Sequence, residues 1–431
     1  MKFRIARTRE DLRSSLWFIP SLCVVSAIAL AEIALRVDRE LEQDGTGWYL
    51  FTGSAESART VVGTIATSML TFTGLVFTVT MLVLELASNQ LSPRVMRTFL
   101  RDRFTQLVLG VFIATFLYAL LVLRGITSTS AGEPFVPALS VWLALVLVLL
   151  SIGLFVYYIH HMAQSIRPTS VMHRVGIEVR DAIEQLYPAG VGETAEPEGL
   201  DDALPAGAAI IPSPGPSGVL TGVDEGQIID AARKSGCVIE LRACIGDFVR
   251  EGAPLFIVRG SWDGSGEGAL RDSVNFGSMR TMVQDASFGF RELVDIAERA
   301  LSPGINDPTT AVQAIDQIHG LLGRLVLRPI PSSRRDVDGK LAAILPRPGW
   351  SDYVALACDE IRRSGQGQMQ VHRRLRAMLF DLLEVAPLNR RAPLEEQIAL
   401  LDMHLHEGFH GRELARAATP SAQGQGPAPQ P

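Results

Sequence analysis

The chain has 431 residues, enough for two or three domains and a substantial core. With 4 cysteines, abundant aliphatic residues and no glycine period, its composition excludes a disulfide scaffold, a disordered chain and a collagen. The formal net charge is −6, and the basic residues gather beside apolar segments instead of forming one patch. We therefore expect no nucleic-acid partner.

Four apolar segments near the N-terminus predict a membrane domain. A helix needs about 20 residues to cross about 30 Å of hydrocarbon, and each segment has about that length or more. The first is read as a retained helix, because Glu32, Arg36 and Asp38 stand where a signal peptide would have its small-residue cleavage site. We predict a four-helix transmembrane domain over residues 1–160, with helices at about 17–35, 61–86, 105–123 and 139–159, and the lipid bilayer as partner.

The charges that flank these segments predict their orientation. Residues 1–15 hold five basic residues and the loop 87–104 holds four. The loop 36–59 has three arginines against five acids, and the loop 124–138 has one arginine and one glutamate. The positive-inside rule then places both termini in the cytoplasm. The four cysteines, Cys23, Cys237, Cys244 and Cys358, need no disulfide in such a compartment.

The second segment carries a stripe of polar and small residues. Their spacings of 4, 3, 4, 3, 4 and 7 place them within an arc of roughly 80° on one helix. Two interpretations stay open. In the first, the hydroxyls bond back to helix carbonyls and the glycine admits a neighbouring helix. In the second, the stripe lines a wetted path whose carboxylate sets charge preference. The stripe consists of Thr60, Thr64, Thr67, Thr71, Gly74, Thr78 and Glu85.

After the membrane domain, a helical extension is predicted at 161–186, a Pro-rich linker at 187–216 and a small β module at 217–260. In the module, strands at 218–223 and 237–242 flank a short helix at 225–234. Residues 246–255, with two Gly-marked turns, resemble the barrel-sandwich fold of biotinyl and lipoyl carrier domains. A carrier needs a lysine on an exposed hairpin, whereas Lys234 falls on the predicted helix. We therefore expect a packed adaptor module.

Residues 261–415 read as a helical domain and 416–431 as a disordered tail. An amphipathic helix at 288–301 is followed by a tight connector in which Asp307 is a good N-cap and Pro308 takes the first helical position. The predicted helices lie at 288–301, 308 to about 327, 352–363, 368–383 and 393–415.

Several strings resemble one protein family, the bacterial predicted membrane proteins catalogued as domain of unknown function 2254. They include Thr71-Phe72-Thr73-Gly74-Leu75, Gln90-Leu91-Ser92-Pro93-Arg94, Gly277-Ser278-Met279-Arg280-Thr281 and Leu301-Ser302-Pro303-Gly304-Ile305-Asn306-Asp307-Pro308. The resemblance implies a multi-helix membrane domain with a cytoplasmic region, and no established activity or catalytic residue. The predicted fold is thus a membrane α-helical bundle with a cytoplasmic α+β region, and the predicted location is the bacterial inner membrane.

Charged residues within and beside these strings have two possible roles. The arginines clamp an anionic ligand, or they pair with nearby acids, since residues 291, 295 and 299 are successive i,i+4 neighbours. The set consists of Arg280, Asp285, Arg291, Asp295, Arg299 and Asp307.

The sequence contains no Walker, Rossmann or nucleophile-elbow motif, so we expect no enzyme, no catalytic residue and no cofactor. We also expect no metal, because His160 and His161 point about 100° apart on a helix and are read as a solvated helix end. The favoured function is a homo-oligomeric channel or permeation protein. The alternative is a non-conducting sensor or scaffold whose cytoplasmic region binds a small ligand or a protein partner.

Overall fold

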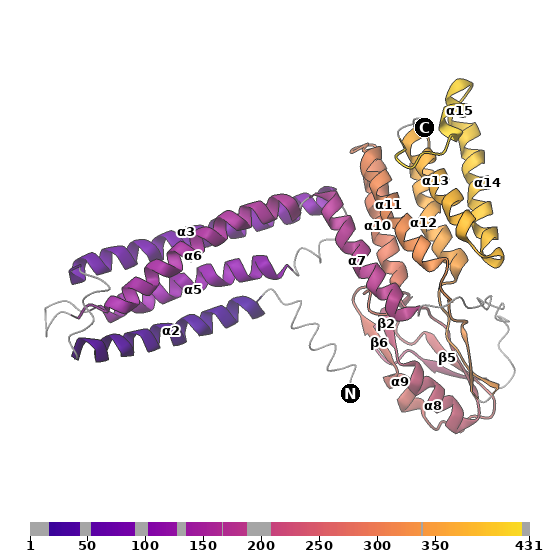
Figure 1. Ribbon diagram of the computed structural model, residues 1–431. Coiled ribbons are helices and arrows are strands. Elements are labelled where there is room, and N and C mark those ends of the chain that lie inside the picture. The colour runs from indigo at the N-terminus through magenta and orange to yellow at the C-terminus, as the bar shows by residue number, and fades with distance from the viewer. Residues whose placement is uncertain are drawn as a thin grey trace. The chain divides into compact units, whose positions relative to one another are not determined.

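The computed structural model in Figure 1 describes residues 17–43, 53–90, 102–126, 135–165, 167–187, 208–337 and 339–424. The chain divides into two compact units, unit 1 with residues 1–170 and unit 2 with residues 171–431. The basic segment 1–15, most of the basic loop 87–104, most of the linker 187–216 and the last seven residues lie outside the described residues.

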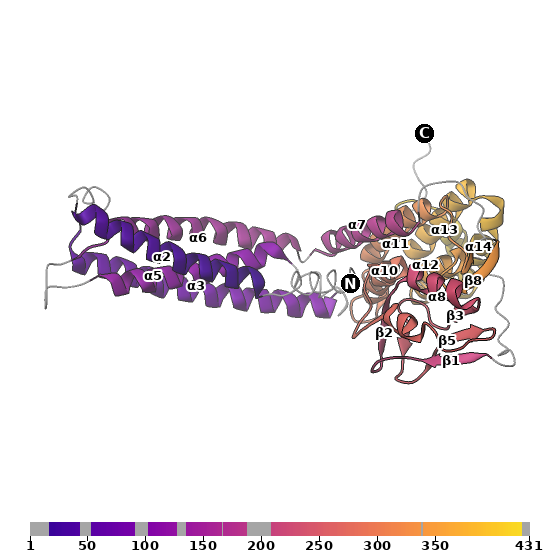
Figure 2. The same cartoon turned by 90° about the horizontal axis from the view of Figure 1, so that it is seen from below.

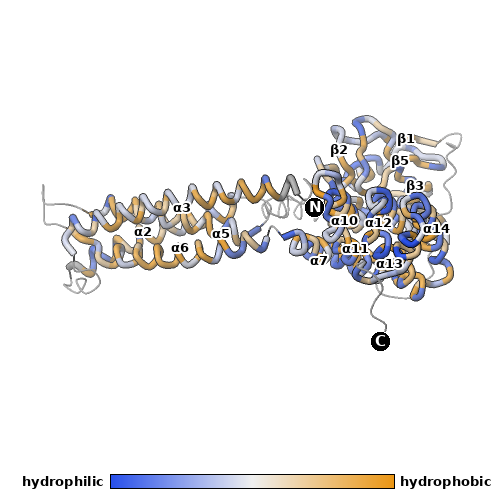
Figure 3. The backbone as a smooth tube through the Cα atoms, turned by 90° about the horizontal axis from the view of Figure 1, so that it is seen from above, coloured by the Kyte–Doolittle hydropathy of each residue, from blue (hydrophilic) through white to orange (hydrophobic). Residues whose placement is uncertain are grey.

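Unit 1 is built from long apolar helices. Among the described residues, four helices are long and apolar enough to cross a membrane, which confirms the prediction of four apolar helices. Figure 3 shows apolar residues along the length of each. The helices run further than the predicted segments because polar residues extend them at their ends. They are α2 (Phe18–Gln43), α3 (Ala55–Gln90), α5 (Arg103–Gly125) and α6 (Ala138–Ser165).

Helices α5 and α6 lie between α2 and α3, and Figure 2 shows the four running side by side. Small residues allow a close approach: a Cβ on Gly110 of α5 would lie 3.0 Å from Cys23 Sγ and 3.1 Å from Pro20 Cα of α2. The core of the bundle contains Ala27, Ala31, Val62, Met69, Tyr118, Val122 and Ala144.

Polar side chains tie the helices together at both ends of α6. The carboxylate of Asp38 accepts hydrogen bonds from Leu139 N at 2.8 Å, Ser140 N at 2.9 Å and Ser140 Oγ at 2.6 Å, and so caps the start of α6. At the other end, Asp102 is the N-cap of α5 and lies 2.8 Å from His161 Nε2. The interpretation of His161 as a solvated helix end is therefore wrong, because this ring joins α6 to α5.

Unit 2 contains short strands that form two sheets in its described part. The five-stranded sheet has the order β1-β5-β3-β8-β7, in which only the β3–β8 pair is parallel, and the three-stranded antiparallel sheet has the order β4-β2-β6. The strands are β1 (Ala209–Pro212), β2 (Gly218–Val223), β3 (Val238–Leu241), β4 (Phe248–Val249), β5 (Pro254–Arg259), β6 (Val274–Gly277), β7 (Arg334–Val337) and β8 (Lys340–Ile344).

The strand–helix–strand pattern predicted at 218–242 is present, with α8 (Glu225–Ser235) between β2 and β3. The predicted helical domain over 261–415 also contains three strands that the sequence did not indicate, β6, β7 and β8. These strands pair with distant ones: Phe276 lies opposite Leu220, and Ala343 opposite Ile239. The sheets thus draw on residues 209–344, a longer stretch than the predicted module. The likeness to a barrel-sandwich stays a prediction.

Helices form the other part of unit 2, and Figure 1 shows α10 to α15 gathered on one side of the strands. The predicted helix at 393–415 is interrupted because Phe409 is extended and Gly411 has a φ of 55°. The helices are α7 (Pro168–Leu186), α9 (Glu267–Asp272), α10 (Ala286–Leu301), α11 (Pro308–Leu325), α12 (Trp350–Ser364), α13 (Met369–Val385), the 3-10 turn η2 (Leu388–Arg390), α14 (Arg391–Gly408) and α15 (Arg412–Ala418).

Helix α7 packs into unit 2 instead of standing apart as an extension. A Cβ on Gly289 of α10 would overlap Val179 Cγ2 of α7, so the two helices are in close contact. At the end of α7, the hydroxyl of Tyr187 lies 2.8 Å from that of Tyr353, and Arg328 donates to the Tyr187 carbonyl at 2.6 Å. Burial raises the pKa of Tyr187, so this pair is uncharged at neutral pH.

Candidate functional site

The predicted stripe lies on the exposed side of α3. All seven members are exposed. The side of α3 that does pack carries Ala58, Val62, Ile65, Met69, Val76 and Val83. At about 100° per residue, the centres of these two faces lie roughly 180° apart.

Two threonines outside the stripe explain why its pattern is blurred in the sequence. Thr73 and Thr80 are partly buried on the inner side of α3. Thr80 Oγ1 lies 2.7 Å from the hydroxyl of Tyr158 on α6. Threonine in this helix therefore has two roles, one inside the bundle and one on its surface.

The hydroxyls of the stripe donate within their own helix. Each threonine bonds the carbonyl four residues earlier, at distances of 2.7 to 3.1 Å. The donors are thus satisfied, while each hydroxyl oxygen keeps the capacity to accept a hydrogen bond. A Cβ on Gly74 would have no neighbour within 4 Å, so no contact within the chain requires glycine there.

The outward faces of α2, α3 and α6 all carry large apolar side chains, which suit lipid. Examples are Leu22 and Ile33 on α2, Leu70 and Phe77 on α3, and Leu149 and Val156 on α6. Exposed polar residues also occur on α2, at Ser26 and Glu32. In its described part, α3 differs in carrying exposed threonines at helical spacing on one face, together with Gly74 and Glu85.

The six charged residues predicted around 280–307 do not gather at one point. Arg280 donates to Asp285 Oδ2 at 2.9 and 2.7 Å, and Asp285 is the N-cap of α10. Arg291 pairs with Asp295 at 2.8 Å, with Glu298 at 3.2 Å and with Glu360 of α12. The structure therefore shows local pairing for the first two arginines.

The last members of that set are placed near the ends of helices. Arg299 is exposed in the last turn of α10. Asp307 is the N-cap of α11, where its carboxylate accepts from Thr310 N at 3.1 Å and Thr310 Oγ1 at 2.6 Å. Pro308 holds the first helical position, as the sequence predicted.

Across the part of the chain that the structure describes, no three His, Cys, Asp or Glu side chains gather to hold a metal ion. The expectation of no metal and no cofactor stays a prediction.

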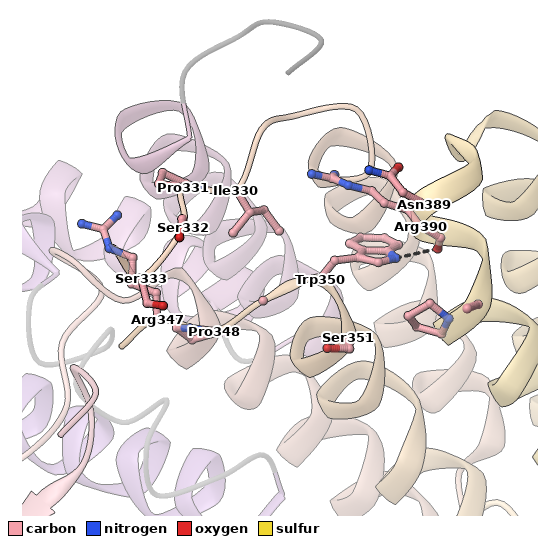
Figure 4. A pocket seen from close by; sticks show the side chains of 13 residues that line it. Ile330, Pro331, Ser332, Ser333, Arg347, Pro348, Trp350, Ser351, Asn389 and Arg390 are labelled. Atoms are coloured by element: carbon pink, nitrogen blue, oxygen red, sulfur yellow. Dashed lines mark hydrogen bonds between the residues drawn. The ribbon is translucent and has the colours of Figure 1, made fainter. Parts of the chain in front are cut away.

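Unit 2 contains a pocket of about 330 Å³ that sequence reasoning did not find. Figure 4 shows Trp350 between Arg347 and Arg390. Three stretches of chain line the pocket: the loop 330–333, residues 347–351, which lead into the first turn of α12, and residues 389–393 around the start of α14. Trp350 Nε1 donates to the Arg390 carbonyl at 2.9 Å, which fixes the two walls against each other.

The guanidinium groups near this pocket differ in their partners, which include backbone carbonyls for one and a carboxylate for the other two. Arg390 donates to the carbonyls of Leu325 and Val326, both at 2.7 Å, at the end of α11. Arg335 pairs with Glu225 at 2.9 Å, and Arg347 pairs with the same carboxylate. Burial lowers the pKa of Arg335, Arg347 and Arg390. Positive charge is thus concentrated in a partly dehydrated wall.

A second buried polar feature lies among α12, α13 and α14. His372 of α13 is 1% exposed, and neither ring nitrogen has a hydrogen-bond partner among the described residues. Burial, together with the nearby His404 and Arg362, lowers the pKa of His372 to about 4. In the sequence, His372 stands within the basic stretch Met369–Arg376, so nothing indicated that its ring is buried.

Comparison with known proteins places these features in a family. Residues 13–381 match the family described as "Predicted membrane protein (DUF2254)". The chain belongs to this family. Relatives in Mycobacterium bovis and Mycobacterium tuberculosis, each described as an uncharacterized protein, are 33% identical to it over 406 residues, which cover 91% of this chain and 76% of theirs. No solved structure matches the chain.

Membership confirms the family resemblance seen in the sequence and establishes a membrane protein with four candidate spans. It assigns no residue a role. In this chain, the α3 stripe and the pocket beside Trp350 are the candidate functional sites.

Proposed function

We propose that this protein is a homo-oligomeric permeation protein of the bacterial inner membrane, in which α3 faces a shared pathway and unit 2, in the cytoplasm, controls assembly or opening. The observation that carries the proposal is the position of the stripe, exposed on the side of α3 opposite to its packed face. A catalytic role is not part of the proposal.

The energetics of a bilayer favour a covered stripe. Lipid offers polar oxygens no partner, so a line of exposed hydroxyl oxygens gains from contact with protein or water. Within the chain, a Cβ at Gly74 would have no packing partner within 4 Å. A second copy of α3 would supply one, because small residues let helices approach closely.

Closure of such contacts around an axis would bring several stripes together. The hydroxyl oxygens would then line the axis, and Glu85 from each copy would form a ring of carboxylates near one end. Carboxylate rings attract cations, so cation preference is the expected outcome.

The experiment compares two glycines that are both exposed in spanning helices with no neighbour within 4 Å, Gly74 on α3 and Gly153 on α6. Native mass spectrometry of the full-length protein in nanodiscs should show an oligomer for the wild type and Gly153→Leu, and a shift toward monomer for Gly74→Leu. A wild-type monomer, or an equal effect of both substitutions, contradicts the assembly.

Permeation is tested separately in liposomes. Ion flux above that of empty vesicles is expected, with Glu85→Gln reducing the preference for cations several-fold. Glu32→Gln, at an exposed carboxylate on α2, is the matched control and should leave the preference unchanged. An oligomer without flux contradicts permeation while leaving the assembly in place.

A non-conducting sensor or scaffold is the second candidate. The threonine hydroxyls already donate hydrogen bonds inside α3, so their contact with lipid costs little free energy. In addition, unit 2 contains a pocket that can bind a ligand. A monomer without flux that binds a ligand through unit 2 would favour this function over permeation.

A further inference from the structure

The pocket beside Trp350 has the charge of an anion site. The structure gives Arg335 and Arg347 one carboxylate partner each, and it is the same carboxylate, that of Glu225. Their side chains are 17% and 24% exposed, so water screens these charges only in part. Two guanidiniums against one carboxylate leave an excess of one positive charge, and Arg347 lines the pocket.

The backbone adds to this potential. Helix α12 begins at the pocket, with Gly349, Trp350 and Ser351 in its wall, so the positive end of its dipole points there. Asp352 takes the Gly349 N–H at 2.7 Å and offsets part of the dipole. The excess charge on the arginine pair is not affected by this cap.

The rest of the lining combines apolar side chains with hydroxyl groups. Ile330 and three prolines, Pro331, Pro348 and Pro393, face the same space as the hydroxyls of Ser332, Ser333 and Ser351. Proline has a fixed φ, so these walls are preformed. A volume of about 330 Å³ is at the lower end of the range for small-molecule sites.

We propose that this pocket binds a small organic anion, whose phosphate or carboxylate group pairs with Arg347 and whose apolar part rests on the isoleucine and the prolines. A guanidinium suits both oxyanions because it donates two parallel hydrogen bonds. The proposal is independent of permeation, since binding is measured whether or not unit 1 conducts.

The experiment uses isothermal titration calorimetry on the full-length protein in detergent. The probes are phenyl phosphate, benzoate, inorganic phosphate and the uncharged benzyl alcohol. Saturable binding of phenyl phosphate or benzoate is expected, with weaker binding of inorganic phosphate and none of benzyl alcohol. Because a hydrogen bond to a charged group contributes about 1.5–3 kcal/mol, Arg347→Gln should weaken binding by roughly 10- to 100-fold.

Two further variants keep the test decisive. Arg271→Gln removes an arginine that is paired at 2.6 Å with Glu267 on α9, away from the pocket lining, and should leave affinity unchanged. Ser351→Phe, at an exposed position of the wall, fills the pocket without touching the arginine pair and should abolish binding even if Arg347→Gln fails to fold. No saturable binding of either organic anion, or binding that survives both pocket variants, overturns the proposal. Equal affinity for inorganic phosphate overturns the apolar part of it.

Discussion

His372 links a single buried ring to the pH dependence of stability. Its pKa is about 4 in the folded protein and about 6.5 in an unfolded chain. As pH falls from 6.5, the unfolded chain takes up the proton first, so the stability due to the neutral ring is present above 6.5 and is lost toward pH 4. We expect Tm, measured by scanning fluorimetry on the full-length protein, to fall across this window, and His372→Phe to reduce that fall.

A histidine on the surface provides the comparison. His406 is exposed on α14, with its Nδ1 2.7 Å from the Asp402 carbonyl. His406→Gln should keep the wild-type slope of Tm against pH. An unchanged slope in His372→Phe would mean that other groups cause the acid sensitivity.

We expect Asp38 to contribute to the stability of unit 1. Its carboxylate accepts three hydrogen bonds at the start of α6, so Asp38→Ala leaves two backbone N–H groups without it. Loss of such a cap lowers the free energy of unfolding by about 1–2 kcal/mol. An SDS titration followed by circular dichroism measures the change. Glu40→Ala, at an exposed position two residues further along α2, should change it by less than about 0.5 kcal/mol, and equal effects would contradict the capping role.

At the level of elements, the contact between α7 and α10 depends on one missing Cβ. Alanine at 289 would overlap Val179 Cγ2 and approach Met282 Sδ to 3.3 Å. Overpacking of this kind costs about 1–3 kcal/mol. We expect Gly289→Ala to lower Tm and to speed hydrogen exchange in residues 171–186, measured by mass spectrometry on the full-length protein.

A glycine in open space is the matched control. Gly320 on α11 is exposed and a Cβ there meets nothing within 4 Å. Gly320→Ala should leave exchange in α7 unchanged and stabilise by up to about 1 kcal/mol, because alanine favours a helix. Normal protection of α7 in Gly289→Ala would show that the two helices separate at little cost.

The sequence predicts these elements to different extents, for physical reasons. Helices with local signals, such as the apolar spans and the Asp307–Pro308 start of α11, are predictable because cap and periodicity lie within one stretch. Strand β7 reads Arg334-Arg335-Asp336-Val337, which has no apolar alternation. It exists because β8 pairs with β3, about a hundred residues earlier, and that contact is tertiary.

The candidate sites show the same limit. The spacing of the stripe fixes which residues share a face of α3, but not whether that face is covered, since that depends on where α5 and α6 lie. The pocket is assembled from three separate stretches of chain, so no local sequence motif indicates it. Arg280 and Arg291 were recognisable as charges, but their pairing with Asp285 and with Glu360 of the distant helix α12 is visible only in the structure.

For the molecule as a whole, all four cysteines are free thiols, and Cys237 and Cys358 are buried. Burial, with Asp359 nearby, raises the pKa of Cys358 to about 12, so it stays a thiol and does not react readily.

We predict the orientation of the whole chain from the number of candidate spans and from charge. Four spans would return the chain to its starting side, and the positive-inside rule predicts that the segments 1–15 and 87–104, which hold five and four basic residues, share that side. We expect a green fluorescent protein fused after residue 431 to fluoresce in bacteria and an alkaline phosphatase at the same point to be inactive. Phosphatase fused in the loop 124–138 should be active. The opposite pattern would place unit 2, with its pocket, outside the cytoplasm, and its ligand would then have to come from there.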